Sequence, residues 1–112
     1  MPISASFIGI DKYLDANIRD LTGARRDATA LWALFCDTIP DIKAELIVDS
    51  DANLERIRRS LKKTFEDAGS EDTIIFSFAG HGTHDHCFVA YRVFVRQKSC
   101  RYGTSYSHRI TA

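Results

Sequence analysis

Several features that mark particular classes of protein are missing from this sequence of 112 residues. No apolar stretch approaches the roughly 18 residues that cross a membrane. The N-terminus lacks the charged segment and the long apolar run of a signal peptide. The three cysteines, Cys36, Cys87 and Cys100, show no repeated spacing and no CxxC zinc pattern, so we expect no disulfide framework. These absences favour a protein of the reducing cytoplasm.

Acidic residues are missing from the end of the chain. Residues 1–85 hold all 15 Asp and Glu and 10 of the 15 Lys and Arg, a net charge of −5, whereas residues 86–112 hold five basic residues and no acid. The chain as a whole is neutral, so charge gives no reason to expect a nucleic-acid or membrane partner. We expect one domain, divided into a regular part, residues 1–86, and an atypical basic tail, residues 87–112. In this tail a fourth strand at residues 87–95 would precede a disordered end.

The order of the expected elements predicts an α/β fold. Apolar runs indicate strands at residues 5–10, 44–48 and 73–81, and apolar residues at three- and four-residue steps indicate helices at residues 24–39 and 54–68. Strands that alternate with helices in this way form a parallel sheet with right-handed crossovers.

Single residues add detail to these elements. Gly9 inside the first strand predicts a close approach of another backbone or of a ligand. Thr22 and Asn53 are the expected N-caps of the two helices. Cys36 lies beside the apolar stripe of the first helix, where a small buried hydrophobic residue is a better interpretation than a nucleophile. The expected buried positions of the second helix are Leu54, Ile57, Leu61, Phe65 and Ala68.

The most informative stretch is residues 73–83. It begins as a continuous apolar run, typical of a strand buried on both faces, and ends in Gly-His-Gly at residues 80–82. Ligands of open α/β sheets bind beyond the carboxyl ends of the strands. His81 is therefore a functional candidate, and its flanking glycines would let a substrate approach closely.

Four segments together resemble the caspase-like cysteine peptidases of the peptidase C14 family, in particular the metacaspase and bacterial caspase-homologue branch. Residues 78–82 (Phe-Ala-Gly-His-Gly) match the strand that ends in the catalytic histidine, and residues 7–13 are similar to the first strand and its exit. Residues 21–28 (Leu-Thr-Gly-Ala-Arg-Arg-Asp-Ala) resemble the element that opens the first helix, and residues 71–73 the acidic entry to the histidine strand. The resemblance covers the N-terminal portion of the family's domain. It implies a three-layer α-β-α fold with a mostly parallel sheet, here truncated.

The resemblance also implies a Cys-His dyad that cleaves peptide or protein substrates. A nearby imidazole favours the thiolate, which is the attacking species, and later protonates the leaving amine. His81 would be this imidazole, and the N–H of Gly82 would donate to the developing oxyanion. Asp27 corresponds to an acidic residue of the substrate pocket, which implies a basic P1 residue; its other interpretation is a first-turn acid favoured by the helix dipole. No metal or cofactor is expected; the family allows calcium, but residues 49–51 are more simply a turn.

The nucleophile is the part of the pattern that these 112 residues lack. In caspases the cysteine follows the histidine by about 50 residues, whereas Cys87 and Cys100 follow His81 closely and lack the family's sequence around the nucleophile. We therefore expect this chain to be inactive by itself, and we interpret residues from about 87 onward as the product of a frameshift, a mis-assigned intron or a truncated gene.

Two other functions stay open. A caspase-like half domain can act as a non-catalytic interaction module by pairing its sheet edge with another chain. A less favoured alternative is a metallohydrolase that uses the cluster of His81, His84 and His86, which nearly matches a zinc motif.

Overall fold

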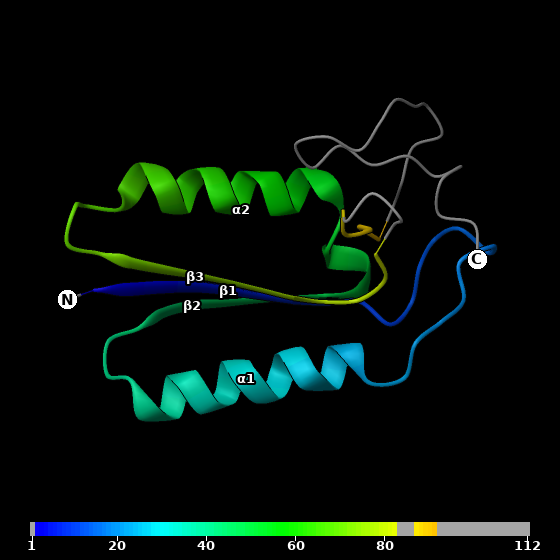
Figure 1. The fold of residues 1–112 in the computed structure, drawn as a ribbon, viewed down its shortest axis with the longest axis horizontal. Helices are drawn as coiled ribbons and strands as arrows, with labels where there is room; N and C mark the ends of the chain where they lie inside the picture. Colours follow the sequence, from blue (N-terminus) through cyan, green and yellow to red (C-terminus); the bar gives the residue numbers. More distant parts are fainter. Residues whose placement is uncertain (1, 83–86, 92–112) are drawn as a thin grey trace.

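Three parallel strands and two helices form the described part of the chain. The computed structural model describes residues 2–82 and 87–91. In chain order the elements are β1 (Ile3–Gly9), α1 (Ala24–Thr38), β2 (Lys43–Val48), the 3-10 helix η1 (Asp49–Asp51), α2 (Leu54–Asp67) and β3 (Thr73–Ala79). The strand order is β2-β1-β3 with both pairs parallel, and α1 and α2 cover opposite faces (Figure 1). The predicted three-layer α/β fold is confirmed.

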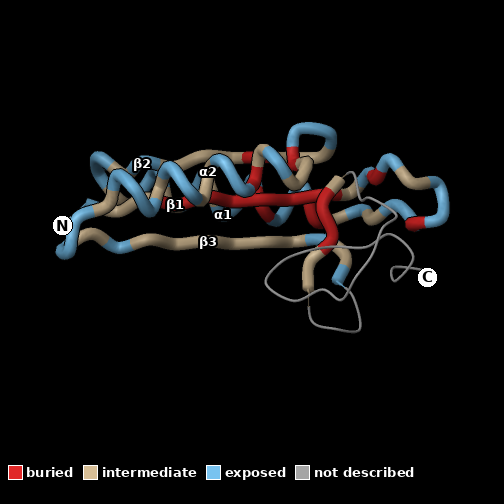
Figure 2. Tube along the Cα trace, turned by 90° about the horizontal axis from the view of Figure 1, so that it is seen from above, coloured by how far each residue is buried: buried red, intermediate tan, exposed pale blue. Residues whose placement is uncertain are grey.

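The central strand β1 supplies residues to two hydrophobic clusters, one on each face of the sheet. Phe7 packs with Ala28 toward α1, and its ring lies 5.3 Å from the ring of Phe35. Ile8 packs with Ile47 of β2 on the face of α2. Figure 2 shows β1 as the most deeply buried strand, whereas β3 is of intermediate burial along most of its length. Because successive side chains of β1 point to opposite faces of the sheet, this one strand packs against α1 on one face and α2 on the other.

Gly9 at the end of β1 is where the backbone of α1 comes closest. A Cβ atom added at Gly9 would lie 2.6 Å from the carbonyl oxygen of Ala24 and 2.7 Å from the Cβ of Ala28. The prediction of a close backbone approach at this glycine is therefore confirmed, and the approaching backbone is that of a helix. Only glycine allows the N-terminal turns of α1 to lie this close to the sheet.

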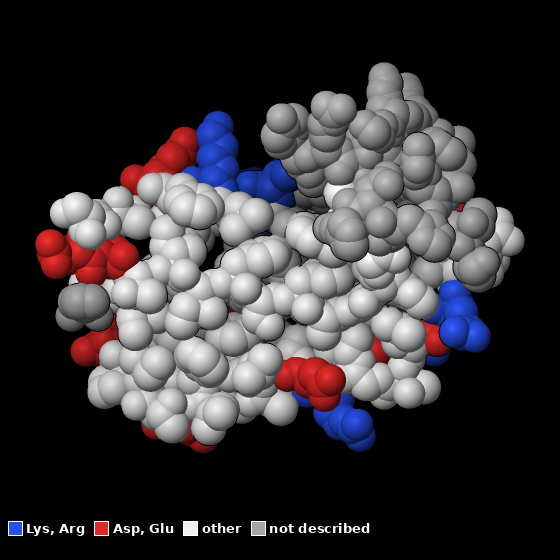
Figure 3. Space-filling view, in the orientation of Figure 1, with Lys and Arg blue, Asp and Glu red and all other residues white. Residues whose placement is uncertain are grey.

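The other helix, α2, packs less completely. Ile57 is buried as predicted, but Phe65 on the expected apolar face is 64% exposed, so its predicted burial is wrong. A cavity of about 330 Å³ lies beneath this end of the helix, lined in part by Ser4, Glu45 and Thr64. The residues that line this cavity are mostly polar, and Phe65 is not among them. On the outer side of α2 acidic side chains lie next to basic ones (Figure 3), as in the pairs Lys62–Glu66 and Lys63–Asp67.

Residues 87–91 return to the C-terminal ends of the strands. Val89 and Ala90 are buried in the cluster on the α2 face, and the N–H of Tyr91 donates to the carbonyl oxygen of Ala52 at 2.9 Å. These five residues contain an isolated bridge from Phe88 to Gly82 and no strand. The rest of the predicted fourth strand and the predicted disordered end lie outside the described residues. Within the described part of the chain, no helix is long and apolar enough to cross a membrane.

Candidate active site

His81 lies just beyond the C-terminal end of β3, at the edge of the sheet where α1 begins. Its side chain is half-buried, and its Nε2 lies 2.8 Å from the backbone carbonyl oxygen of Arg19. A carbonyl oxygen can only accept a hydrogen bond, so this contact assigns the proton of the neutral imidazole to Nε2. Nδ1 then carries the lone pair. The geometry therefore leaves one defined ring nitrogen to act as a base.

The backbone on either side of the imidazole is held in place, but one amide is left unused. The carbonyl oxygen of His81 accepts a hydrogen bond from Val89 at 3.0 Å. Among the described residues, the N–H of Gly82 has no hydrogen-bond acceptor. A Cβ atom added at Gly82 would meet the carbonyl oxygen of Cys87 at 3.5 Å, an ordinary contact. Packing against the described residues thus does not require glycine at this position, and the missing side chain leaves the amide open to approach.

The loop between β1 and α1 brings Arg19 to His81. Two hydrogen bonds within the loop hold the segment around Arg19: Leu21 donates to the carbonyl oxygen of Asp11 at 2.8 Å, and Ile18 donates to that of Asp15 at 3.0 Å. Ile18 is buried in the core. Because these contacts hold the loop on both sides of Arg19, its carbonyl oxygen has a defined position. Sequence reasoning missed Arg19, since a backbone carbonyl can belong to any residue type.

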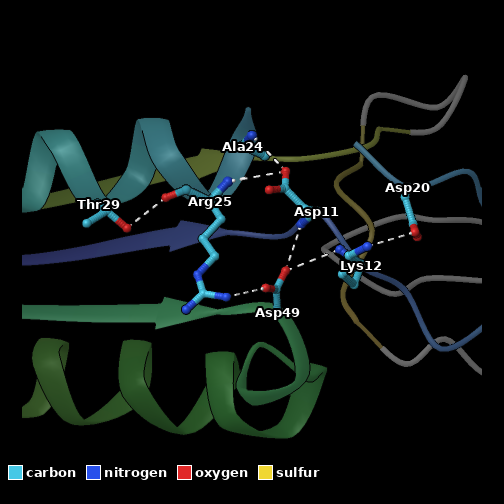
Figure 4. Close-up of polar contacts among 7 residues, drawn as sticks. All are labelled: Asp11, Lys12, Asp20, Ala24, Arg25, Thr29 and Asp49. Atoms are coloured by element: carbon cyan, nitrogen blue, oxygen red, sulfur yellow. Dashed lines mark hydrogen bonds and ion pairs between the residues drawn. The ribbon is translucent and has the colours of Figure 1, made fainter. Parts of the chain in front are cut away.

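Two carboxylates join this loop to α1 and β2 (Figure 4). Asp11 Oδ1 accepts hydrogen bonds from the backbone N–H groups of Ala24 at 2.8 Å and Arg25 at 3.3 Å. Asp11 therefore provides the side-chain cap of α1, and the prediction that Thr22 does so is wrong; Gly23 occupies the N-cap position without a side-chain bond. The physical reason is that a carboxylate from the end of a neighbouring strand can reach the free amides of a helix N-terminus as well as a local side chain can.

Asp49 is the second of these carboxylates. It accepts hydrogen bonds from the backbone N–H groups of Asp11 at 2.9 Å and Lys12 at 3.2 Å, and it forms an ion pair with Arg25 at 3.2 Å. The turn predicted at residues 49–51 is the 3-10 helix η1, and Asp49 adopts a positive φ of 48°. Its oxygens are thus used by backbone amides and a guanidinium group, so Asp49 connects the exit of β2 to the exit of β1.

Tyr13 is a further residue of the site that sequence reasoning missed. Its hydroxyl oxygen accepts a hydrogen bond from the backbone N–H of His81 at 2.8 Å, and the two ring centroids lie 5.2 Å apart. Desolvation by burial raises the pKa of Tyr13 to about 12, against the opposing effect of the His81 hydrogen bond. The phenol therefore keeps its proton over the whole neutral range.

Asp27 lies at the same edge of the sheet but does not contact His81. It is exposed in the first turn of α1. Among the described residues its carboxylate makes no hydrogen bond and no ion pair, although its backbone N–H donates to Gly23 at 2.9 Å. An unused acid in this position fits both predicted interpretations, a substrate contact and a favourable interaction with the helix dipole.

The described cysteines do not complete the site. Cys36 is a free thiol near the C-terminal end of α1, far along the helix from the edge that carries His81; it is exposed, so its predicted burial is wrong. The preceding residue, Phe35, packs against Phe7 of β1, and because adjacent residues of a helix point about 100° apart, Cys36 falls on the exposed side of α1. Cys87 is disulfide-bonded, contrary to the expected absence of disulfides, and so is not a thiol that can attack.

The metal-binding alternative concerns residues that are mostly not described. His84 and His86 lie outside the described residues, as does Cys100. Among residues 2–82 and 87–91, no group of three or more His, Cys, Asp or Glu side chains could hold a metal ion. His81, the one described member of the predicted cluster, is engaged with the carbonyl oxygen of Arg19.

Comparison with known proteins identifies the family. A scan against protein-family models matches the Caspase domain over residues 4–105. This range extends past residue 86, where the recognisable motifs end. No curated protein and no solved structure gives a match. With nearly the whole chain matched, and with its parallel sheet and two helices in the expected order, this protein belongs to the caspase-domain family of cysteine peptidases.

Proposed function

We propose that this chain forms the histidine-bearing part of a caspase-like cysteine endopeptidase site. The observation that carries the proposal is the contact between Nε2 of His81 and the carbonyl oxygen of Arg19. It leaves Nδ1 as the base, at the edge of the sheet where α/β proteins bind their ligands. The N–H of Gly82, the next residue, has no acceptor among the described residues and can donate to the carbonyl oxygen of a substrate peptide bond beside His81.

The proposed chemistry follows from these two groups. Nδ1 of His81 takes the proton of a cysteine thiol, and the thiolate attacks the carbonyl carbon of the scissile peptide bond. The N–H of Gly82 donates to the negatively charged oxygen of the tetrahedral intermediate. The imidazolium then gives its proton to the leaving amine as the C–N bond breaks. Asp27 would pair with an Arg or Lys side chain at P1, because its carboxylate is exposed and has no partner among the described residues.

The nucleophile is the missing component, so we expect no peptidase activity from this chain alone. The assay is the cleavage of fluorogenic peptides with Arg, Lys or Asp at P1 by the purified 112-residue protein. Cleavage that survives the double change Cys87→Ala and Cys100→Ala but is lost in His81→Ala would contradict the Cys-His mechanism. Cleavage that the double change abolishes would instead contradict the expected inactivity.

Peptide binding tests the substrate assignment without requiring catalysis. A labelled peptide with Arg at P1 should bind more tightly than the same peptide with Asp, by roughly five- to tenfold, since an exposed ion pair contributes about 1 kcal/mol. The change Asp27→Asn should remove this preference. Asp37→Asn, at the other end of α1, is the matched control and should leave it intact. An unchanged preference in Asp27→Asn would refute the role of Asp27.

A non-catalytic interaction module is the second candidate. It is favoured by the position of β3, which in the described sheet is paired on one side only, with β1. A free strand edge can bind a strand of another chain. Sedimentation analysis of the whole chain tests this alternative, which requires a stable oligomer or complex. The metallohydrolase alternative requires stoichiometric zinc in protein purified without a His tag.

A further inference from the structure

Tyr13 contacts both the backbone and the ring of the proposed catalytic histidine. Its hydroxyl oxygen accepts the hydrogen bond from the N–H of His81 at 2.8 Å, and the rings are tilted by 59° at a centroid distance of 5.2 Å. Tyr13 is only 8% exposed and belongs to the cluster on the α2 face. The tyrosine is therefore a fixed support rather than a surface side chain that happens to lie nearby.

The contact between Tyr13 and His81 leaves no space for a side chain at Gly80. A Cβ atom added at Gly80 would lie 2.8 Å from the hydroxyl oxygen of Tyr13 and 2.9 Å from the ring of Phe78. Since real Cβ atoms essentially never approach another heavy atom below 3.0 Å, a side chain at residue 80 would displace the tyrosine hydroxyl. The glycine before the histidine thus has a physical explanation in this structure. It makes room for the hydroxyl group that binds the next residue.

The neighbours of Tyr13 hold it against His81. The next residue, Leu14, donates its N–H to the carbonyl oxygen of Tyr91 at 3.1 Å. The preceding residue, Lys12, donates its N–H to Asp49 at 3.2 Å. Both flanking amides are therefore used, by two different parts of the chain. The tyrosine side chain enters the core from a backbone that is held on both sides.

From this geometry we infer that Tyr13 is a positioning residue for His81. Its hydroxyl oxygen fixes the backbone where β3 ends, and its ring fixes the imidazole plane, so that Nε2 stays on the carbonyl oxygen of Arg19 and Nδ1 faces the substrate. The inference rests on the proposed function, because it assigns a role to Tyr13 in the same site. It adds a residue that neither contacts the substrate nor exchanges a proton. The raised pKa of Tyr13 supports the second point, since a phenol that stays neutral does not compete with His81 for protons.

The test is NMR spectroscopy of the full chain labelled with ¹⁵N-histidine, with the signals of His81 assigned by comparison with His81→Gln. Two properties of His81 are measured: the visibility of the Nε2–H proton, which requires protection from exchange with water, and the exchange rate of its backbone amide. In Tyr13→Phe the aromatic ring is kept and only the hydroxyl is lost. We expect the Nε2–H signal to disappear and the His81 amide to exchange about fivefold faster, which is the effect of losing one hydrogen bond.

Controls separate this local effect from a general loss of stability. Tyr91→Phe is the matched change, because Tyr91 makes its hydrogen bonds to described residues through its backbone. It should leave both His81 signals unchanged. The amide of Ile8 in β1 reports on the whole fold and should exchange at the same rate in Tyr13→Phe as in the unaltered chain. Gly80→Ala is the second variant, and it should reproduce the loss of the Nε2–H signal by displacing the tyrosine hydroxyl.

Two results would overturn the inference. One is a His81 Nε2–H signal and amide exchange rate that are the same in Tyr13→Phe as in the unaltered chain. The other is an equal acceleration of exchange at His81 and Ile8, which would mean that Tyr13 only stabilises the core. Neither measurement involves peptide cleavage or binding. If the proposed peptidase function fails its own tests, the effect of Tyr13 on His81 is still measured independently.

Discussion

Gly9→Ala should be one of the most destabilising single-methyl changes in the described part of this protein. The added Cβ would lie 2.6 Å from the carbonyl oxygen of Ala24, 2.7 Å from the Cβ of Ala28 and 3.0 Å from the Cα of Arg25. All three atoms belong to the backbone or to a Cβ atom of α1, so no flexible side chain can move away. Relief requires α1 to shift outward by about 1 Å, because β1 is held by hydrogen bonds to strands on both sides.

The expected loss of stability is about 2–3 kcal/mol, the upper part of the range for overpacked cores. For a small domain that unfolds with a urea dependence of about 2 kcal/mol per M, the unfolding midpoint should fall by about 1–1.5 M. Urea unfolding followed by circular dichroism measures this shift. The matched control is Gly69→Ala, where the added Cβ would have only carboxylate oxygens of Asp72 at 3.9 and 4.0 Å. This control should leave the midpoint unchanged or raise it slightly.

A midpoint for Gly9→Ala that equals that of Gly69→Ala would refute the close packing of α1 on β1. If Gly9→Ala does not fold, a second variant keeps the prediction testable. Ala28→Gly removes one of the two closest contacts at residue 9, so adding it to Gly9→Ala should restore folding in part. The two changes should therefore couple favourably, although Ala28→Gly alone costs about 1 kcal/mol as a glycine inside a helix.

Two further predictions concern polar groups that hold separate elements together. Asp11→Ala should destabilise the protein by about 1–2 kcal/mol in thermal or urea unfolding, because it removes the side-chain cap of α1. Asp11→Asn should be less destabilising, because it keeps an oxygen that can accept a hydrogen bond from the N–H of Ala24. Equal losses of stability in both variants would argue against capping. At Glu45, burial acts to raise the pKa of the carboxyl group, but hydrogen bonds from Arg56 and Ser60 outweigh burial and hold the pKa below its usual 4.5. Glu45→Gln should therefore cost up to about 1 kcal/mol at neutral pH, and this cost should shrink as the pH falls below 4.5, through the lowered pKa of the folded state. A cost that does not change with pH would mean that the charge of Glu45 plays no part.

The elements of the fold could be predicted because each is determined by residues close together in the chain. Both helices begin at the predicted residues, Ala24 and Leu54, and each ends one residue earlier than predicted. The predicted cap at Asn53 is confirmed, since its side chain accepts from the N–H of Arg56 at 2.8 Å. The parallel order of the strands also follows from the alternation of strands and helices. Periodicity and caps are local properties, and a sequence displays them directly.

The candidate site could be predicted only in part. Motif resemblance led to His81, Gly82 and Asp27, whose catalytic and substrate-binding roles stay predictions. Two contacts that hold His81 in place could not be predicted from the sequence. The contact with Arg19 uses a backbone carbonyl, which any residue type could provide, and the contact with Tyr13 joins residues that are 68 positions apart.

By itself, the sequence determined the order, type and approximate limits of the helices and strands, and it placed a histidine between two glycines at the end of the third strand. Only the tertiary structure decided which nitrogen of His81 holds the proton, which carboxylate caps α1 and why residue 80 is glycine. The physical reason is the range of the interactions. Helices and strands form from neighbouring residues, whereas His81 is oriented by a loop that folding brings to the end of β3.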